Sequence, residues 1–339
     1  MRILAIESSC DETAAAVVED GTRVLSSVVA SQLETHGRYG GVVPELASRA
    51  HLEVLLPAIE ESLRQAGAGF RDIDAVAATR GPGLIGALLV GLTAAKAMAF
   101  ALDIPLLAVN HLEAHIYANF LHFEDLEPPL VAFVVSGGHT LLVHMTEHRR
   151  YRLLGETLDD AAGEAYDKVA RYLGLGYPGG AAIDRIARQG DPSAIAFPRA
   201  IMRDGSYNFS LSGLKTAVIN YVRKLKENGQ PVPTEDIAAG FEAAVVEVQV
   251  FKIVRAAQET AVKSVLLAGG VAANSYLREK LQEALDPMRV KLYYPPLQLC
   301  MDNAAMVAAL GARMLSEGDI SGLEVDVAAK LSLASAVSS

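Results

Sequence analysis

The sequence is poor in cysteine, with only Cys10 and Cys300 among its 339 residues. Two cysteines cannot build a disulfide framework, so a disulfide-stapled secreted scaffold is excluded and a reducing cytoplasm is expected. A repeating Gly-X-Y pattern is also absent, which excludes a collagenous chain. Intrinsic disorder is excluded as well, because 51% of the residues are hydrophobic.

Long hydrophobic runs of the kind that cross membranes are missing too. The apolar run at residues 3–6 is closed by Glu7, far short of the apolar core of a signal peptide. The longest apolar stretch, residues 84–100, is interrupted by Lys96, whereas a spanning helix needs ~20 largely uncharged residues. We therefore expect a buried helix at residues 84–100, a cytoplasmic protein and no membrane partner.

Positively charged residues are fewer than negatively charged ones. The chain has 30 Lys and Arg residues and 40 Asp and Glu residues, which gives a formal net charge of -10. Such a chain is expected to be soluble but does not attract nucleic acid by its overall field. Contact with DNA or RNA would need a local basic patch or a basic partner. The local basic runs are Arg149-Arg150-Arg152, Arg223-Lys224-Lys226 and Arg278-Lys280. An acidic helical stretch carries Asp159, Asp160, Glu164 and Asp167, and by default both kinds of run are solvated surface.

Predicted strands alternate with predicted helices, which indicates an α/β fold with mostly parallel sheets. Strands are expected at residues 1–6, 14–18, 73–78, 105–109, 130–135, 141–145 and 264–268, and helices at 46–65, 81–100, 111–121 and 274–285. A strand, a turn of small residues and a second strand occur near residue 1 and again near residue 130. This repeat predicts two related lobes, and the length also suggests two domains.

Two histidines four residues apart, His111 and His115, are the sharpest local signal. Asn110 can cap a helix that starts here, which would place both histidines near its beginning. Residues i and i+4 share a helix face with Cβ atoms about 5–6 Å apart, so both imidazoles could bind one metal ion. Two polar residues at an exposed helix end are the alternative. Glu113 falls on the opposite side of the helix, so the general base of the zinc-protease motif is missing.

Three turns and one carboxylate could contribute to a binding site. Residues 136–140 form a turn of Ser, two Gly, His and Thr, where backbone amides can hold an anion or simply close a hairpin. The turn at residues 8–13 is acidic and fits a phosphate mainly through an intervening cation. The Gly-Gly junction at residues 269–274 joins a strand to a helix start, a common nucleotide-binding arrangement. Asp302 is either a helix N-cap or a carboxylate ligand of a metal.

Ten motifs follow one another in a fixed order between residues 3 and 306. They lie at residues 6–13 (Ile-Glu-Ser-Ser-Cys-Asp-Glu-Thr), 40–49, 81–84 (Gly-Pro-Gly-Leu), 110–115 (Asn-His-Leu-Glu-Ala-His), 134–140, 159–168, 177–180 (Tyr-Pro-Gly-Gly), 209–216 (Phe-Ser-Leu-Ser-Gly-Leu-Lys-Thr), 268–274 and 302–306 (Asp-Asn-Ala-Ala-Met). In this combination the chain resembles the TsaD family, the bacterial tRNA adenosine threonylcarbamoyltransferases once labelled O-sialoglycoprotein endopeptidases.

The resemblance implies the actin-like/Hsp70/sugar-kinase (ASKHA) fold, in which two RNase-H-like lobes enclose a ligand cleft. The first lobe would comprise residues 1–109 plus 302–339, and the second residues 110–301. The implied activity is that of a metal-dependent acyltransferase of tRNA processing. It moves the threonylcarbamoyl group of L-threonylcarbamoyl-AMP to N6 of the adenosine adjacent to the anticodon, position 37, in tRNAs reading ANN codons. AMP is released, and the product is threonylcarbamoyladenosine.

The resemblance also assigns residues and partners. His111, His115 and Asp302 take the family's metal positions, with one divalent ion per subunit, iron(II) being favoured and zinc the alternative. Asp11 and Glu12 are further candidates for a part in catalysis. The positions that bind the adenylate are Val134, Val135, Ser136, Gly137, Gly138, Asp167, Gly180, Asp184 and Asn274. The implied partners are tRNA, threonylcarbamoyl-AMP, a paralogous TsaB-like dimerisation subunit and a small TsaE-like ATPase.

Three other functions remain open at this point. An ASKHA-type ATPase or kinase would use the same phosphate loops without the histidine pair. A metalloendopeptidase is suggested by the histidine spacing but opposed by the position of Glu113. A scaffold without catalytic activity is opposed by the presence of the histidine pair itself.

Overall fold

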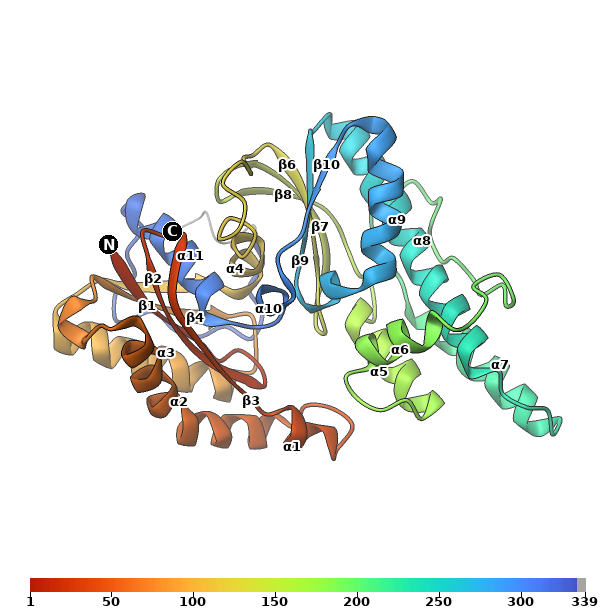
Figure 1. Ribbon diagram of the computed structural model, residues 1–339, viewed down its shortest axis with the longest axis horizontal. Helices are drawn as coiled ribbons and strands as arrows, with labels where there is room; N and C mark the ends of the chain where they lie inside the picture. Colours follow the sequence, from red (N-terminus) through yellow and green to blue (C-terminus); the bar gives the residue numbers. More distant parts are fainter. Residues whose placement is uncertain (334–339) are drawn as a thin grey trace. The chain divides into compact units, whose positions relative to one another are not determined.

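The computed structural model describes residues 1–333, which form two compact units, each built on a five-stranded sheet (Figure 1). One unit comprises residues 1–126 together with the chain from residue 295 onward, and the other comprises residues 127–294. The boundaries expected from the family resemblance, after residues 109 and 301, differ from these units by the segments 110–126 and 295–301. Helix α4 lies in the first of these segments and packs on α11 of the first unit.

The first unit contains three antiparallel strands followed by two parallel ones. Its elements are β1 (Arg2–Glu7), β2 (Glu12–Glu19), β3 (Arg23–Ser31), α1 (Leu33–Gly37), α2 (Pro44–Ala66), η1 (Phe70–Asp72), β4 (Ala75–Gly81), α3 (Ile85–Leu102), β5 (Leu106–Asn110), α4 (His111–Tyr117), α10 (Leu297–Cys300) and α11 (Ala304–Ser316). The sheet order is β3-β2-β1-β4-β5, with β1 antiparallel to β2 and parallel to β4.

The second unit repeats this plan. Its elements are β6 (Leu130–Val135), β7 (Thr140–Glu147), β8 (Arg150–Glu156), α5 (Ala162–Leu173), α6 (Gly179–Ala187), α7 (Ser212–Glu227), α8 (Thr234–Thr260), β9 (Ser264–Ala268), η2 (Gly270–Ala273), α9 (Ser275–Leu285), η3 (Asp286–Met288) and β10 (Lys291–Tyr293). The order β8-β7-β6-β9-β10 matches that of the first sheet strand for strand, with the same parallel and antiparallel pairings. The repeated hairpin in the sequence therefore does mark two related α/β units.

Helices cover both faces of the first sheet, which explains why β1 is apolar throughout. Leu4 and Ile6 belong to the core formed with α2 and α3. Alternate strand residues point the other way, and there Gly311 of α11 approaches Ala77 so closely that a Cβ would lie 2.9 Å from the alanine methyl. Strand β1 is thus buried from both sides, and its carboxyl end is held rigidly.

Helix α3 differs from the expectation of a buried helix, because only one of its faces is covered. Leu88 and Leu92 are buried, whereas Leu89 is 44% and Phe100 is 76% exposed. In residues 1–333 it is the one helix long and apolar enough to cross a membrane, with 33% of that span buried. Since it packs on α2 and β4, we read it as a sheet-covering helix with an exposed apolar side.

Candidate functional site

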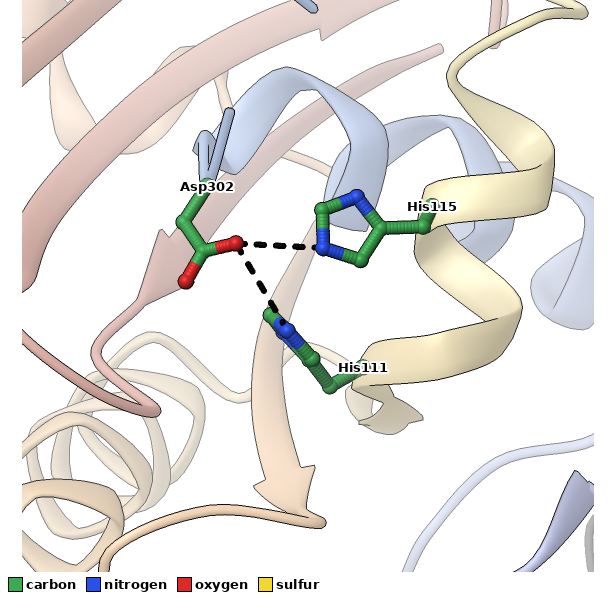
Figure 2. A group of neighbouring side chains, drawn as sticks. All are labelled: His111, His115 and Asp302. Atoms are coloured by element: carbon green, nitrogen blue, oxygen red, sulfur yellow. Dashed lines mark ion pairs between the residues drawn. The ribbon is translucent and has the colours of Figure 1, made fainter. Parts of the chain in front are cut away.

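The histidine pair stands at the start of α4, directly after β5. The Asn110 side chain caps this helix as predicted, its Oδ1 accepting hydrogen bonds from the amides of Leu112 at 2.9 Å and Glu113 at 3.3 Å. The cap fixes the first turn, so His111 and His115 project from one face of α4 (Figure 2). Both are buried, which removes the alternative of two polar residues at an exposed helix end.

Asp302 faces the two histidines from the segment before α11 (Figure 2). Its Oδ1 lies 3.1 Å from Nε2 of His115 and 3.6 Å from Nε2 of His111. One ligand atom from each residue fits within a 4.8 Å span. The helix cap is Asn303, whose Oδ1 accepts the Met306 amide at 2.9 Å. Of the two roles considered for Asp302, the N-cap is therefore wrong, and its carboxylate is directed at the imidazoles.

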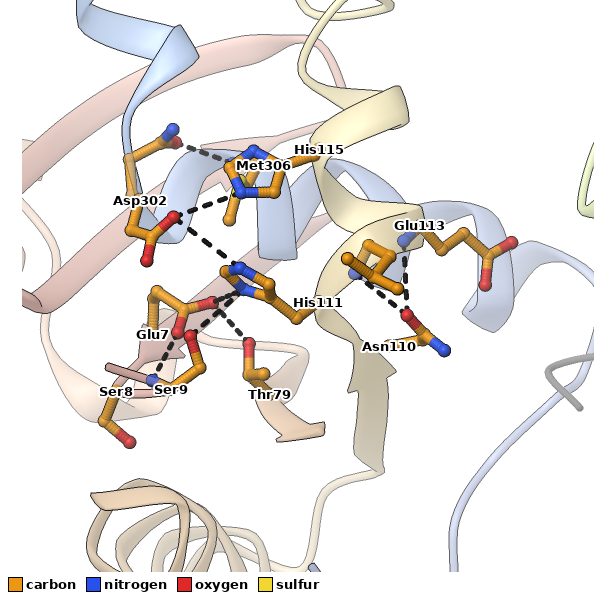
Figure 3. A network of polar contacts seen from close by, with 12 residues as sticks. Glu7, Ser8, Ser9, Thr79, Asn110, His111, Glu113, His115, Asp302 and Met306 are labelled. Atoms are coloured by element: carbon orange, nitrogen blue, oxygen red, sulfur yellow. Dashed lines mark hydrogen bonds and ion pairs between the residues drawn. The ribbon is translucent and has the colours of Figure 1, made fainter. Parts of the chain in front are cut away.

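Glu7 lies behind His111 and was missed by the sequence analysis. It ends β1, is fully buried, and places Oε2 3.1 Å from Nδ1 of His111. Thr79 donates to the same Oε2 at 2.6 Å, and the Ser9 amide donates to Oε1 at 2.6 Å, so the carboxylate is held from both sides (Figure 3). A carboxylate on Nδ1 fixes the imidazole orientation and leaves Nε2 for a metal. In the sequence, Glu7 could have been recognised as a charged residue at the end of an otherwise apolar strand.

Electrostatics tie these groups together. Burial disfavours the charged imidazole, but the carboxylates of Asp302 and Glu7 outweigh it and raise the pKa of His111 to about 9. Burial likewise opposes ionisation of Glu7, yet His111 keeps its pKa below the usual range. The site thus holds a positive charge between two carboxylates, a position that a metal cation can also take.

The donor set fits a divalent metal ion. Two imidazole nitrogens and one carboxylate oxygen are common ligands of zinc and of iron(II), and three protein ligands leave coordination positions for substrate. His115 supports this fit, since among the described residues its buried ring nitrogens make no hydrogen bond and only the ion pair to Asp302 approaches one of them.

Asp11 and Glu12, the two further candidates, flank the same region. Asp11 is buried and Glu12 is partly buried at the start of β2. Burial, followed by the charges of Asp302 and Asp11, raises the pKa of Glu12 to about 9. The accumulation of carboxylates around Asp302 increases the attraction for a cation.

Glu113 takes no part in this cluster. It is buried in α4 and points away from the histidine face (Figure 3). A metalloprotease needs a carboxylate over the metal as general base, and Glu113 does not occupy that position.

The predicted adenylate residues all lie in the second unit. Strands β6 and β9 are parallel neighbours, so their carboxyl ends meet at one edge of the sheet, where ligands bind in open α/β sheets. Val134 and Val135 end β6 and are buried, while Gly137 and Gly138 in the following turn are exposed. The Ser136 amide donates to the His139 carbonyl at 2.8 Å and is therefore part of the turn.

Two glycines let the neighbouring elements touch this turn. A Cβ on Gly163, in the first turn of α5, would lie 2.7 Å from both the Gly137 Cα and the Ser136 carbonyl oxygen. Gly269 has φ +89°, and a Cβ there would lie 2.5 Å from the Val135 carbonyl oxygen. The N-terminus of α5 therefore lies directly beside the open glycines. Its first amides are used within the protein, since Ala162 donates to Thr140 Oγ1 at 2.9 Å and Gly163 donates to the Ser136 carbonyl at 3.1 Å, so only the helix dipole favours an anion here.

The remaining predicted residues are tied to the protein itself. Asp167 Oδ1 accepts the Gly179 amide at 2.7 Å, next to Gly180 at the start of α6. Asp184 Oδ1 accepts the Ser275 hydroxyl at 2.6 Å. Each side chain therefore fixes a helix start, that of α6 for Asp167 and that of α9 for Asp184.

Asn274 is held by a buried carboxyl group that the sequence analysis missed. Its Oδ1 accepts the Leu277 amide at 2.7 Å and caps α9, and its Nδ2 donates to Glu242 Oε1 at 2.6 Å. Glu242 is 3% exposed, and burial raises its pKa to about 7, with Asp184 raising it further and the Asn274 hydrogen bond lowering it. In the sequence, Glu242 could have been recognised as a single acidic residue within an apolar segment, which forms the buried part of α8.

Comparison with known proteins identifies the family of the chain. A family model described as "TsaD: tRNA N6-adenosine threonylcarbamoyltransferase" matches residues 23–309. A tRNA N6-adenosine threonylcarbamoyltransferase of Symbiobacterium thermophilum is 57% identical over 332 residues, covering 98% of this chain and 96% of the relative. One of Bacillus subtilis is 56% identical over 319 residues, covering 94% and 92% of the two chains.

Solved structures show the same fold at low sequence identity. Full-length HypF in its phosphate- and nucleotide-bound form aligns with a TM-score of 0.64 at 14% identity, over 94% of this chain and 47% of HypF. Component A of (R)-2-hydroxyglutaryl-CoA dehydratase from Acidaminococcus fermentans gives 0.57 at 16% identity, over 93% and 99%. These likenesses confirm the expected ASKHA-type fold and nothing further. By the family model and the relatives, the chain belongs to the tRNA N6-adenosine threonylcarbamoyltransferase family and is a transferase of tRNA modification.

Proposed function

We propose that the chain transfers the threonylcarbamoyl group of L-threonylcarbamoyl-AMP to N6 of adenosine 37 in tRNAs reading ANN codons. The observation that carries the proposal is the buried cluster of His111, His115 and Asp302, backed by Glu7, in a chain that matches this family along nearly its whole length. An ASKHA-type kinase needs no such cluster, and a metalloendopeptidase needs a base that Glu113 does not supply. Family membership favours the transferase over both.

His111, His115 and Asp302 would hold one divalent ion, iron(II) in preference to zinc. When bound, the ion supplies Lewis-acid polarisation of a substrate oxygen. Glu7 keeps Nδ1 of His111 occupied so that Nε2 faces the ligand position. Asp11 adds negative charge near Asp302. Glu12, whose pKa is raised to about 9, is protonated at neutral pH and would ionise only when a cation lowers that pKa.

The turn after β6 would bind the adenylate phosphate. The amides of Gly137 and Gly138 would face the anion, with the dipole of the adjacent α5 N-terminus in support. The Ser136 amide, which we expected to contribute, is used within the turn. Val134, Val135, Asp167, Gly180, Asp184 and Asn274 would complete the site around the carboxyl ends of β6 and β9.

The reaction itself balances without an external reagent. The lone pair of adenosine N6 attacks the carbamoyl carbon of the mixed anhydride, a C–N bond forms, and the C–O bond to phosphate breaks with its electron pair leaving on AMP. The amine loses one proton. Since the exocyclic amine is a poor nucleophile, positioning it against the activated carbonyl should supply much of the acceleration.

Partner subunits would bind to the first unit. Helices α2 and α3 pack together and expose Leu52 (68%), Leu56 (64%) and Phe100 (76%). An apolar surface of this kind marks a protein–protein contact. We assign it to the paralogous TsaB-like subunit, with a small TsaE-like ATPase completing a cytoplasmic complex.

The test is a reconstitution with unmodified tRNA, threonine, bicarbonate, ATP, the adenylate-forming enzyme and the partner subunits, followed by nucleoside analysis. Threonylcarbamoyladenosine should appear only with this chain present. ATP hydrolysis or proteolysis by rigorously purified chain, without the modified nucleoside, would refute the proposal.

A further inference from the structure

A pocket of about 430 Å³ opens on the second unit between α5 and α7, two helices that pack on each other. Its lining residues are Lys168, Arg171, Tyr172, Lys215 and Ile219. Lys226, near the end of α7, continues the lining, with its Nζ 5.5 Å from the centre of the Tyr172 ring. We call these six residues the basic groove.

The basic groove stands out against the charge of the chain. Helices α5 and α7, taken together with Asp159 and Asp160, carry six Lys or Arg and five Asp or Glu, a net charge of +1 in a chain whose net charge is -10. Arg171 and Lys226 are exposed. A local excess of cations in an acidic protein directs a polyanion to that place and away from the remaining surface.

Two acidic residues, expected to form a solvated face, instead build the groove. Asp160 accepts a hydrogen bond from Lys168 at 2.8 Å and another from Lys215, so one carboxylate joins the two helices. Asp159 Oδ1 accepts the amides of Leu211 at 2.8 Å and Ser212 at 3.1 Å, which fixes the start of α7. The groove is therefore held in shape without a ligand.

Lys168 and Lys215 each keep hydrogen-bonding capacity. An ammonium group has three N–H donors. Lys168 uses one on Asp160 and one on Glu164 at 2.7 Å, and Lys215 uses one on Asp160. Donors held in fixed positions lose little conformational entropy when they bind phosphate oxygens.

Most cations of the other basic runs are buried or paired within the protein. Arg149 is buried, and Arg150 pairs with Glu147 at 3.0 Å. Arg278 donates to the Ala272 carbonyl at 2.6 Å, and Lys280 pairs with Glu283 at 2.8 Å.

We propose that the basic groove binds the sugar–phosphate backbone of the tRNA substrate, with Tyr172 as a stacking surface for a nucleobase. The inference rests on the proposed function, which makes tRNA the substrate. From Lys215 to Lys226 the cations extend about 16 Å along α7, which suits several successive phosphates better than one mononucleotide. Single-stranded RNA is bound by this combination of cations and aromatic rings.

The test compares two double variants in the complete reconstituted system. Arg171→Glu/Lys226→Glu reverses the exposed cations of the groove and leaves Lys168 and Lys215 in place. Arg203→Glu/Lys263→Glu changes the net charge equally at exposed positions elsewhere in the second unit. Thermal unfolding of both proteins checks that the fold is retained, and Tyr172→Phe against Tyr172→Ala tests stacking separately.

We expect the groove variant to raise the KM for tRNA on the order of tenfold, with kcat and the KM for threonylcarbamoyl-AMP little changed. The slope of log affinity against log salt concentration should become shallower by about one for each lost phosphate contact. The control pair should behave as wild type, and Tyr172→Phe should bind tRNA better than Tyr172→Ala.

Three results would overturn the inference. One is an equal loss in the control pair, and another is a raised KM for the adenylate instead of tRNA, which would make the groove a small-anion site. The third is full recovery with excess ATPase subunit, which would make it a protein-docking surface. If the wild type modifies no tRNA, the proposed function fails, and direct titration of labelled tRNA against the same proteins still decides the role of the groove.

Discussion

Replacing Glu242 by Gln should change how stability depends on pH, and the magnitude follows from the burial of this carboxyl group. Its pKa rises from 4.5 to about 7 in the folded protein, a shift of roughly 2.5 units or about 3 kcal/mol. Because the folded pKa is raised, the protonated carboxyl stabilises the fold fully below pH 4.5, and this contribution is lost as pH rises through 7.

Glutamine keeps the carbonyl oxygen that accepts the Asn274 amide but does not ionise. The free energy of unfolding of Glu242→Gln minus that of wild type should therefore increase by about 2–3 kcal/mol between pH 5 and 8.5. Subtraction removes the titrations shared by both proteins. The pKa of Tyr166, which the charge of Glu242 helps to raise, lies above this pH range and does not disturb the difference.

Urea unfolding at several pH values measures this difference. Glu235→Gln, at an exposed position in the first turn of the same helix, controls for the loss of one carboxylate in contact with water. A difference that stays flat with pH, or that falls as pH rises, would show that Glu242 is not held in an environment that disfavours its charge.

Three further substitutions separate the metal site from the adenylate site. His111→Ala should abolish transfer and lower bound metal measured by elemental analysis, since two ligands hold a divalent ion poorly; full activity of metal-free variant would contradict the assignment. Glu7→Gln should weaken metal affinity roughly 10–100-fold in a chelator competition, because a neutral amide orients His111 less firmly; unchanged affinity would make Glu7 merely structural. Asn274→Ala should weaken binding of a threonylcarbamoyl-AMP analogue in calorimetry while metal content stays near normal. Unchanged analogue binding with a loss of metal would show that Asn274 belongs to the metal site and not to the adenylate site.

The sequence predicted the buried strands well and the partly exposed strands poorly. Strands β1 and β6 are apolar throughout, and so is β5, which is buried although it lies at a sheet edge. Strands β3 and β8 were not predicted because exposed polar residues interrupt their apolar pattern. Helix α8 was not predicted either, since its middle is buried on nearly all sides and shows no 3.6-residue period.

The metal candidates were predictable in part from local spacing. Two histidines at i and i+4 behind a capping Asn110 carry their own signal, and the structure places them as expected. Asp302, far along the chain, was assigned by family resemblance rather than by spacing. Glu7 and Glu242 depend on contacts between segments distant in sequence, which no local pattern encodes.

The first unit is discontinuous, and this affects the order in which the protein can be completed during synthesis. His111 and His115 leave the ribosome long before Asp302, and at about 5–20 residues per second the interval is roughly 10–40 s. During that time β1 and β2 lack α11, which covers one face of their sheet. The second unit, residues 127–294, is continuous and is synthesised entirely within the interval. Metal binding through all three ligands is therefore a late event, because it requires Asp302 to have been synthesised. A truncated product ending before Asp302 would contain the whole second unit but lack the metal centre.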